Sequence, residues 1–118
     1  MARILVVDDD PAVRELVAEY IAARGHQVLR AANGAEACEV LEREPVELVV
    51  TDLQMPVLDG LALLAHVRSS RNPIPVIVVS GSWTPDQRGR ARELGAVRVY
   101  SKPVDLAQLA RDVGELAR

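Results

Sequence analysis

Four short apolar runs in this 118-residue chain each end at a polar residue that can take part in chemistry. The runs span residues 4–7, 48–51, 76–79 and 97–101. They are rich in β-branched residues, a pattern that predicts strands buried on both faces of a parallel sheet. The residues that directly follow them are Asp8, Asp52, Ser80 and Lys102. Because ligands bind at the carboxyl ends of the strands in an open α/β sheet, the pattern predicts one shared polar site.

The segments between these runs carry the three- to four-residue apolar spacing of amphipathic helices. We predict strands over residues 3–8, 27–31, 47–51, 75–80 and 97–101. We predict helices over residues 11–24, 35–43, 60–70 and 85–94, and a last helix that begins after Asp105. Five strand–helix units with right-handed crossovers fit a doubly wound, five-stranded parallel sheet of order 2-1-3-4-5, which is the flavodoxin-like α/β fold.

Residues that favour helix starts support these boundaries. Asp10 can cap the first helix, with Pro11 at its first position, where the missing N–H does no harm. Thr84 and Gln87 have the spacing of a capping box. The apolar stripe of the first helix, which we expect to face the core, consists of Val13, Leu16, Val17, Tyr20 and Ile21.

Composition excludes several classes of function. The net charge is −3 and the arginines are scattered, so nothing suggests a nucleic-acid footprint. No apolar stretch approaches the roughly 20 residues of a membrane span, and no signal peptide precedes the first strand. The single Cys38 cannot form an internal disulfide, which fits a reducing cytoplasm. We therefore expect one cytoplasmic domain over residues 1–118 with no direct contact to membrane or nucleic acid.

Asp8, Asp9 and Asp52 follow strands that are neighbours in the predicted order. Three crowded carboxylates repel one another and need compensation to stay ionised. A divalent cation with oxygen ligands supplies it, and Mg²⁺ suits a few carboxylates together with phosphate oxygens. With Mg²⁺ present, Asp52 can attack phosphorus as a nucleophile. The metal, Lys102 and Ser80 would then hold the oxygens of a transferring phosphoryl group.

Lys102 is the one lysine in a chain that has thirteen arginines. A lysine at the end of a strand, in a chain that otherwise uses arginine, indicates that a compact point charge is needed there. A chance placement is the alternative. A cis peptide bond before Pro103 is a further hypothesis, since it could aim the lysine inward.

Four segments together resemble the motifs of response-regulator receiver domains. They are residues 4–11 (ILVVDDDP), 52–60 (DLQMPVLDG), 79–81 (VSG) and 102–103 (KP). The resemblance covers the whole chain, and the motifs are specific when taken jointly. It implies that Asp52 accepts a phosphoryl group and that Mg²⁺ is bound by Asp9 directly and by Asp8 mainly through water. It also implies that the backbone carbonyl of Gln54 ligates the metal.

By the same resemblance, Ser80 is the hydroxyl that senses the phosphoryl group and Lys102 is the lysine that binds it. The family implies a sensor histidine kinase or a histidine phosphotransfer protein as donor. Phosphorylation then biases the domain toward a second conformation. The face of the fourth helix, fifth strand and fifth helix would bind a downstream protein and could form a phosphorylation-dependent homodimer. The domain would catalyse only its own phosphorylation and dephosphorylation, so it is not expected to be an enzyme.

The chain departs from the family pattern near Lys102. Many receivers have an aromatic residue three positions before this lysine, where this chain has Val99; Tyr100 follows and points to the opposite face. Val104 stands where phenylalanine is frequent in the family, and the chain has no phenylalanine. Trp83 lies in the loop that the switch should move, so it is either a passive loop residue or part of a partner surface.

Three alternatives remain open. The chain could be the receiver part of a longer regulator with an effector domain. It could be an unphosphorylated interaction domain, although the complete set of site residues disfavours this. A Mg²⁺-dependent aspartyl phosphohydrolase is also conceivable, but such enzymes commonly need a second aspartate two residues after the first, where this chain has Gln54.

Overall fold

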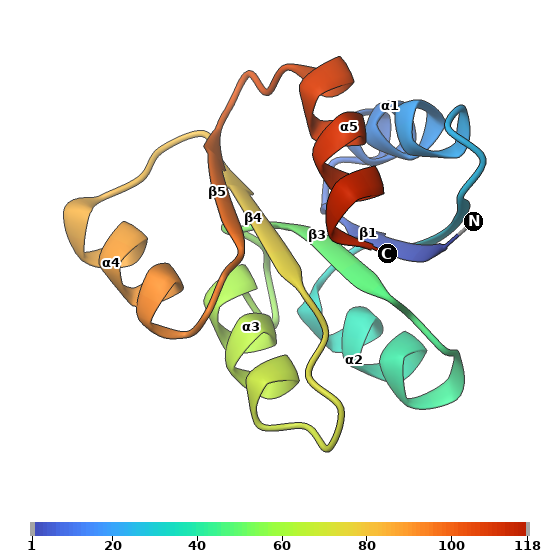
Figure 1. The fold of residues 1–118 in the computed structure, drawn as a ribbon. Coiled ribbons are helices and arrows are strands. Elements are labelled where there is room, and N and C mark those ends of the chain that lie inside the picture. The colour runs from blue at the N-terminus through green and yellow to red at the C-terminus, as the bar shows by residue number, and fades with distance from the viewer. Residues whose placement is uncertain (1, 118) are drawn as a thin grey trace.

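The computed structural model describes residues 2–117, which form one parallel sheet covered by helices on both faces (Figure 1). The strands are β1 (Arg3–Val7), β2 (Gln27–Ala31), β3 (Leu48–Asp52), β4 (Val76–Ser80) and β5 (Arg98–Ser101). The helices are α1 (Pro11–Ala22), α2 (Gly34–Arg43), α3 (Gly60–Arg68), α4 (Pro85–Glu93) and α5 (Leu106–Leu116). The strand order is β2-β1-β3-β4-β5, which confirms the predicted doubly wound fold.

The core consists of two apolar clusters, one on each face of the sheet. Successive strand residues point to opposite faces, so Ile4 and Val6 of β1 pack against α1 and α5, while Leu5 packs against the other face. Helices α2, α3 and α4 contribute to the second cluster through residues such as Ala37, Leu64 and Ala91. Strands β3 and β4 are buried throughout, and β1 is buried from Ile4 onward, as the apolar runs predicted.

The fifth strand corrects one prediction, because it is not buried on both faces. β5 is the last strand of the sheet, and its end residues Arg98 and Ser101 are exposed. Val99 and Tyr100 are half-buried and pack into opposite clusters. An apolar run therefore identified the strand correctly but could not distinguish an edge strand from a central one.

The apolar stripe of α1 is also narrower than predicted. Val17 and Ile21 are buried, but Leu16 is 45% exposed and Tyr20 is 43% exposed. The helix packs against the sheet and against α5 with its buried side, which includes Val17, Ala18 and Ile21. Two large apolar side chains are thus left at the surface.

Predicted helix starts agree closely with the structure, whereas several ends differ by one or two residues. Asp10 accepts hydrogen bonds from the first turn of α1, and Thr84 and Gln87 form the capping box of α4. Helix α1 ends at Ala22 and not at 24, because the chain turns through Gly25, whose φ of 90° favours glycine. Within residues 2–117, no helix combines the length and apolarity that crossing a bilayer requires.

Candidate functional site

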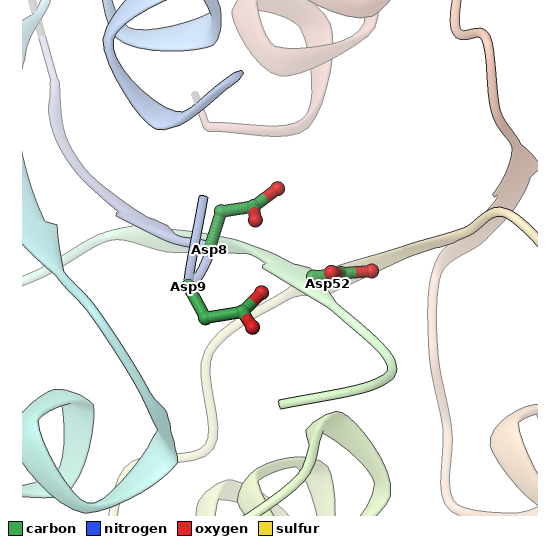
Figure 2. A group of neighbouring side chains, drawn as sticks. All are labelled: Asp8, Asp9 and Asp52. Carbon is green, nitrogen blue, oxygen red and sulfur yellow. The ribbon is translucent and has the colours of Figure 1, made fainter. Parts of the chain in front are cut away.

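Three aspartates meet where β1 and β3 end side by side. Val7 pairs with Thr51 in the sheet, so the next residues, Asp8 and Asp52, lie at the same edge. One carboxylate oxygen from each of Asp8, Asp9 and Asp52 lies within 4.8 Å of the other two. Figure 2 shows the three side chains together. The structure therefore brings together the three carboxylates that the sequence placed at neighbouring strand ends.

Lys102 reaches the same group of side chains from the end of β5. Its Nζ lies 3.3 Å from an oxygen of Asp8 and 3.3 Å from an oxygen of Asp52. The backbone N–H of Lys102 donates to the carbonyl of Ser80, which ties the end of β5 to the end of β4. The Lys102–Pro103 peptide bond is cis. One ammonium thus pairs with two of the three carboxylates.

Burial and charge act on the pKa of Asp52 in opposite directions. Burial raises this pKa first, and the nearby Asp8 carboxylate raises it further. Lys102 and the N–H of Leu53, which donates to Asp52 Oδ1 at 2.9 Å, lower it, but the net pKa stays above the ordinary value. For Lys102, burial lowers the pKa, but Asp52 and Asp8 outweigh burial and raise it overall. The lysine is therefore held in its charged form, whereas ionised Asp52 lacks full compensation.

The loop after Asp52 is held close to that residue by a glycine. The N–H of Gly60 donates to the carbonyl of Leu53 at 2.8 Å. A Cβ at Gly60 would clash with the backbone carbonyl of Asp52, so a larger residue would push the loop away from the site. Asp59 caps α3 by accepting from the N–H of Ala62. Asp59 and Gly60 thus shape the loop that follows Asp52.

Besides the ion pair with Lys102, one contact at its side chain and one at its backbone carbonyl hold Asp8 in place. The N–H of Asp10 donates to Asp8 Oδ1 at 3.0 Å. The guanidinium of Arg14 donates to the carbonyl of Asp8 at 2.8 Å. Arg14 lies one turn into α1. No sequence motif identifies this contact, because it depends on how α1 packs over the end of β1.

Ser80 is fully buried at the end of β4, and its hydroxyl is engaged within its own loop. It donates to the carbonyl of Ser82 at 3.1 Å and accepts from the N–H of Ser82 at 3.2 Å. Gln54, exposed after β3, donates from its side-chain amide to the Ser82 hydroxyl at 3.3 Å. The two loops that flank Asp52 are thus joined through Ser82.

Trp83 connects this loop to β5, which the sequence did not reveal. Its ring packs in the same cluster as Val99, and its Nε1–H donates to the carbonyl of Tyr100 at 2.8 Å. The guanidinium of Arg88 lies 5.3 Å from the centre of the indole and donates to Ser101 Oγ. On the face of β5 where Val99 lies, an aromatic residue is therefore present, but it comes from the β4–α4 loop and not from the strand.

The donor set fits a hard divalent cation. The three clustered side chains offer only carboxylate oxygens, which are the ligands that Mg²⁺ prefers, and Asp8 and Asp52 are only 5% and 8% exposed. A cation bound there would compensate the charge that raises the pKa of Asp52. An oxygen nucleophile, a cation site and an ammonium group together suit phosphoryl transfer.

The model of one protein family, the response regulator receiver domain, matches residues 4–113. The chain belongs to this family. Receiver domains are phosphoryl-accepting modules of two-component signalling, and the strand order found here is the CheY-like arrangement. The acidic group of Asp8, Asp9 and Asp52 is typical of the divalent-metal pocket of receivers.

Curated relatives of this receiver differ greatly in length. Sporulation initiation phosphotransferase F of Bacillus subtilis is 32% identical over 107 residues, which cover 91% of this chain and 86% of that protein. Transcriptional regulatory protein GlrR of Escherichia coli is 36% identical over 104 residues, which cover 88% of this chain. The chain spans only 23% of the length of GlrR, so it corresponds to one part of that regulator.

Solved structures show the same fold along nearly the whole chain. A response regulator receiver protein from Pseudomonas putida matches with a TM-score of 0.92 and 34% identity, covering 97% of this chain and 96% of that one. A CheY-like receiver from Methanospirillum hungatei matches with a TM-score of 0.93 and 27% identity, covering 99% and 94% of the two chains. The receiver fold is therefore shared in full.

Proposed function

We propose that Asp52 accepts a phosphoryl group from a phosphorylated histidine of a sensor kinase or phosphotransfer protein. The observation that carries this proposal is the position of Asp52. Its carboxylate lies 3.3 Å from the Lys102 ammonium and within 4.8 Å of oxygens of Asp8 and Asp9. Asp52 thus has both an ammonium and a candidate cation site beside it, which is what a carboxylate needs to act as the nucleophile in phosphoryl transfer.

The transfer exchanges one bond to phosphorus for another. An Asp52 oxygen attacks the phosphorus, the new P–O bond forms as the P–N bond to the donor imidazole breaks, and the imidazole nitrogen keeps the electron pair and takes up a proton. Asp8, Asp9, the Asp52 carboxylate and the Gln54 carbonyl would hold Mg²⁺. Bound there, Mg²⁺ would neutralise charge on the phosphoryl oxygens.

Lys102 and Ser80 have separate tasks in this proposal. Lys102 donates to a phosphoryl oxygen, since its flexible stem and compact charge can follow the group as it moves onto Asp52. Ser80 releases the Ser82 carbonyl, which its hydroxyl contacts at 3.1 Å, and donates to the phosphoryl group instead. That exchange would alter the β4–α4 loop and bias the domain toward a second conformation.

Acetyl phosphate with Mg²⁺, followed by intact-mass measurement, tests the acceptor. We expect one added phosphoryl group on the wild-type protein and none on Asp52→Asn. Asp59→Asn is the matched control, because it changes a nearby carboxylate that caps α3 and should keep the adduct. An adduct that persists in Asp52→Asn, or no adduct with any donor, would contradict the proposal.

The output surface is the face formed by α4, β5 and α5. Support comes from the contacts that join the Ser80 loop to β5 through Trp83 and from the exposed arginines of α4. A downstream protein would bind this face after phosphorylation, or a second copy of the chain would do so. A comparison of beryllofluoride-treated and untreated protein by sedimentation tests the dimer, which should form only in the treated sample.

The activity of the whole protein depends on what surrounds the receiver in its natural chain. A stand-alone signalling module is the leading proposal, and a receiver within a longer regulator is the alternative, since GlrR extends far beyond the matched region. A phosphohydrolase is disfavoured because Gln54 cannot act as a general acid. The domain should therefore turn over only its own aspartyl phosphate.

A further inference from the structure

A cavity of about 430 Å³ lies between α1, α5 and the sheet. Valines form much of its wall: Val50 and Val79 from the sheet, Val13 and Val17 from α1, and Val104 from the loop before α5. Organic ligands commonly occupy cavities of roughly 300–1,000 Å³. The volume is thus sufficient for a molecule with an aromatic ring and a short chain.

Short side chains leave this space open. The chain has no phenylalanine, and the apolar side chains that line the space are valines, leucines and a proline. Wall atoms without a neighbour forgo dispersion contacts, so an apolar body that enters the cavity gains contacts that the protein does not make by itself. The space is partly open to solvent, so a ligand can enter it and cover apolar wall atoms that otherwise face water.

The cavity is polar at one end only. Asp8, Asp52 and Lys102 line it there, at the carboxyl edge of the sheet. Lys102 is already paired with both aspartates at 3.3 Å, and Asp9 lies in the same group of carboxylates, so the site holds three carboxylates and one ammonium. Each carboxylate oxygen can accept more than one hydrogen bond. This end of the cavity therefore attracts a cation and repels an anion.

We propose that the cavity binds a small organic cation with an apolar body, such as an arylalkylammonium. The ring lies among the valines, and the ammonium donates to Asp8 and Asp52. Such a ligand uses the same carboxylates as the proposed Mg²⁺ site, so the two exclude each other. The site is thereby an inhibitory one, because a receiver that holds the ligand cannot assemble the cation site that phosphorylation needs.

The direct test uses phenethylamine and two probes of similar shape, neutral 2-phenylethanol and anionic 3-phenylpropionate. Methyl signals of the cavity valines are followed by NMR in protein free of divalent ions. We expect the amine to shift these signals and to bind about tenfold more tightly than the alcohol, because its hydrogen bonds are charge-assisted. Equal binding of the carboxylate, or valine signals that do not move with the amine, would overturn the proposal.

Two filling variants test the location. Val104→Phe and Val13→Phe place an aromatic ring in the cavity from opposite walls, and each should abolish amine binding. Val104→Ala is the matched control, because it enlarges the space and should keep binding. Using both walls keeps the test valid if one variant does not fold. Unchanged amine binding in a folded filling variant would contradict this location.

Competition tests the inhibitory role. Phenethylamine should raise the Mg²⁺ concentration needed for half-maximal thermal stabilisation, and the alcohol should not. This arm rests on the proposed Mg²⁺ site, whereas direct binding of the amine does not. Amine binding without competition would refute the shared carboxylates, while absent Mg²⁺ binding would count against the proposed function instead. Failures of the two proposals are therefore distinguishable.

Discussion

The Lys102 ammonium lies 3.3 Å from the Asp52 carboxylate, yet the pKa of Asp52 remains raised. Burial and the neighbouring Asp8 outweigh the ion pair. Ionised Asp52 therefore destabilises the folded protein. A cation or a positively charged ligand that binds beside Asp52 removes part of this destabilisation. The first two predictions follow from this imbalance.

Asp52→Asn should stabilise the protein at neutral pH by about 1 kcal/mol. A raised folded-state pKa means that ionised Asp52 disfavours folding above its ordinary pKa of 3.8. The cost disappears as the pH falls through the folded-state pKa and then below 3.8, where the carboxyl is protonated in both states. Urea unfolding at pH 7 and pH 3 checks this, with the exposed Asp86→Asn as control. A gain that is equally large at pH 3 would contradict the explanation.

Mg²⁺ should raise the melting temperature, because a ligand that binds only the folded state stabilises it. At a hundredfold excess over Kd the gain is about 2.7 kcal/mol. Asp9→Asn should lose most of this gain, and because Asp9 is exposed, its stability without Mg²⁺ should change little. Differential scanning fluorimetry with Mg²⁺ and with EDTA measures both effects. Full stabilisation of Asp9→Asn by Mg²⁺ would remove Asp9 from the site.

Val57→Gly should stabilise the protein by about 1 kcal/mol. Val57 has a φ of 71°, which is unfavourable for a β-branched residue, and its side chain is 82% exposed. Glycine removes the strain and loses little packing. Val57→Ala is the matched control, since it also shortens the side chain but keeps a Cβ, and it should gain less. Chemical denaturation of the three proteins ranks them.

Tyr100→Phe should leave stability unchanged or raise it by up to about 1 kcal/mol. Among the described residues, the Tyr100 hydroxyl is the buried side-chain group that has no hydrogen-bond partner. Removing the hydroxyl removes the free-energy cost of keeping this polar group away from water, while the ring stays in the core cluster. Tyr20→Phe, at an exposed position of α1, serves as the control and should show no effect. Destabilisation of Tyr100→Phe would indicate a partner for this hydroxyl.

Emission from Trp83, the single tryptophan, should shift to the red when beryllofluoride and Mg²⁺ are added. If the Ser80 hydroxyl donates to the phosphoryl mimic, it no longer donates to the Ser82 carbonyl. The indole of Trp83, the next residue, then loses its hydrogen bond to the Tyr100 carbonyl. Ser80→Ala should abolish the shift while keeping Mg²⁺ binding. An unchanged spectrum in the wild-type protein would exclude a rearrangement of this loop.

Several parts of the fold were predictable because they depend on local physics. Caps such as Asp10 and Thr84 act within one helical turn, so spacing alone locates them. Buried strands such as β3 and β4 were evident from their apolar runs. The burial of Leu16 and the burial of β5 on both faces were predicted wrongly, because both depend on which neighbouring element covers a surface.

The sequence by itself determined the strand order and the residue types at the strand ends, since periodicity and right-handed crossovers leave few topologies. It thereby placed Asp8, Asp52 and Lys102 at one edge. Only the tertiary structure decided the pairing of Lys102 with both aspartates, the contact of Trp83 with β5, and the cavity between α1 and α5. Those features depend on side chains that are distant in sequence and on the space they leave unfilled, which no local pattern encodes.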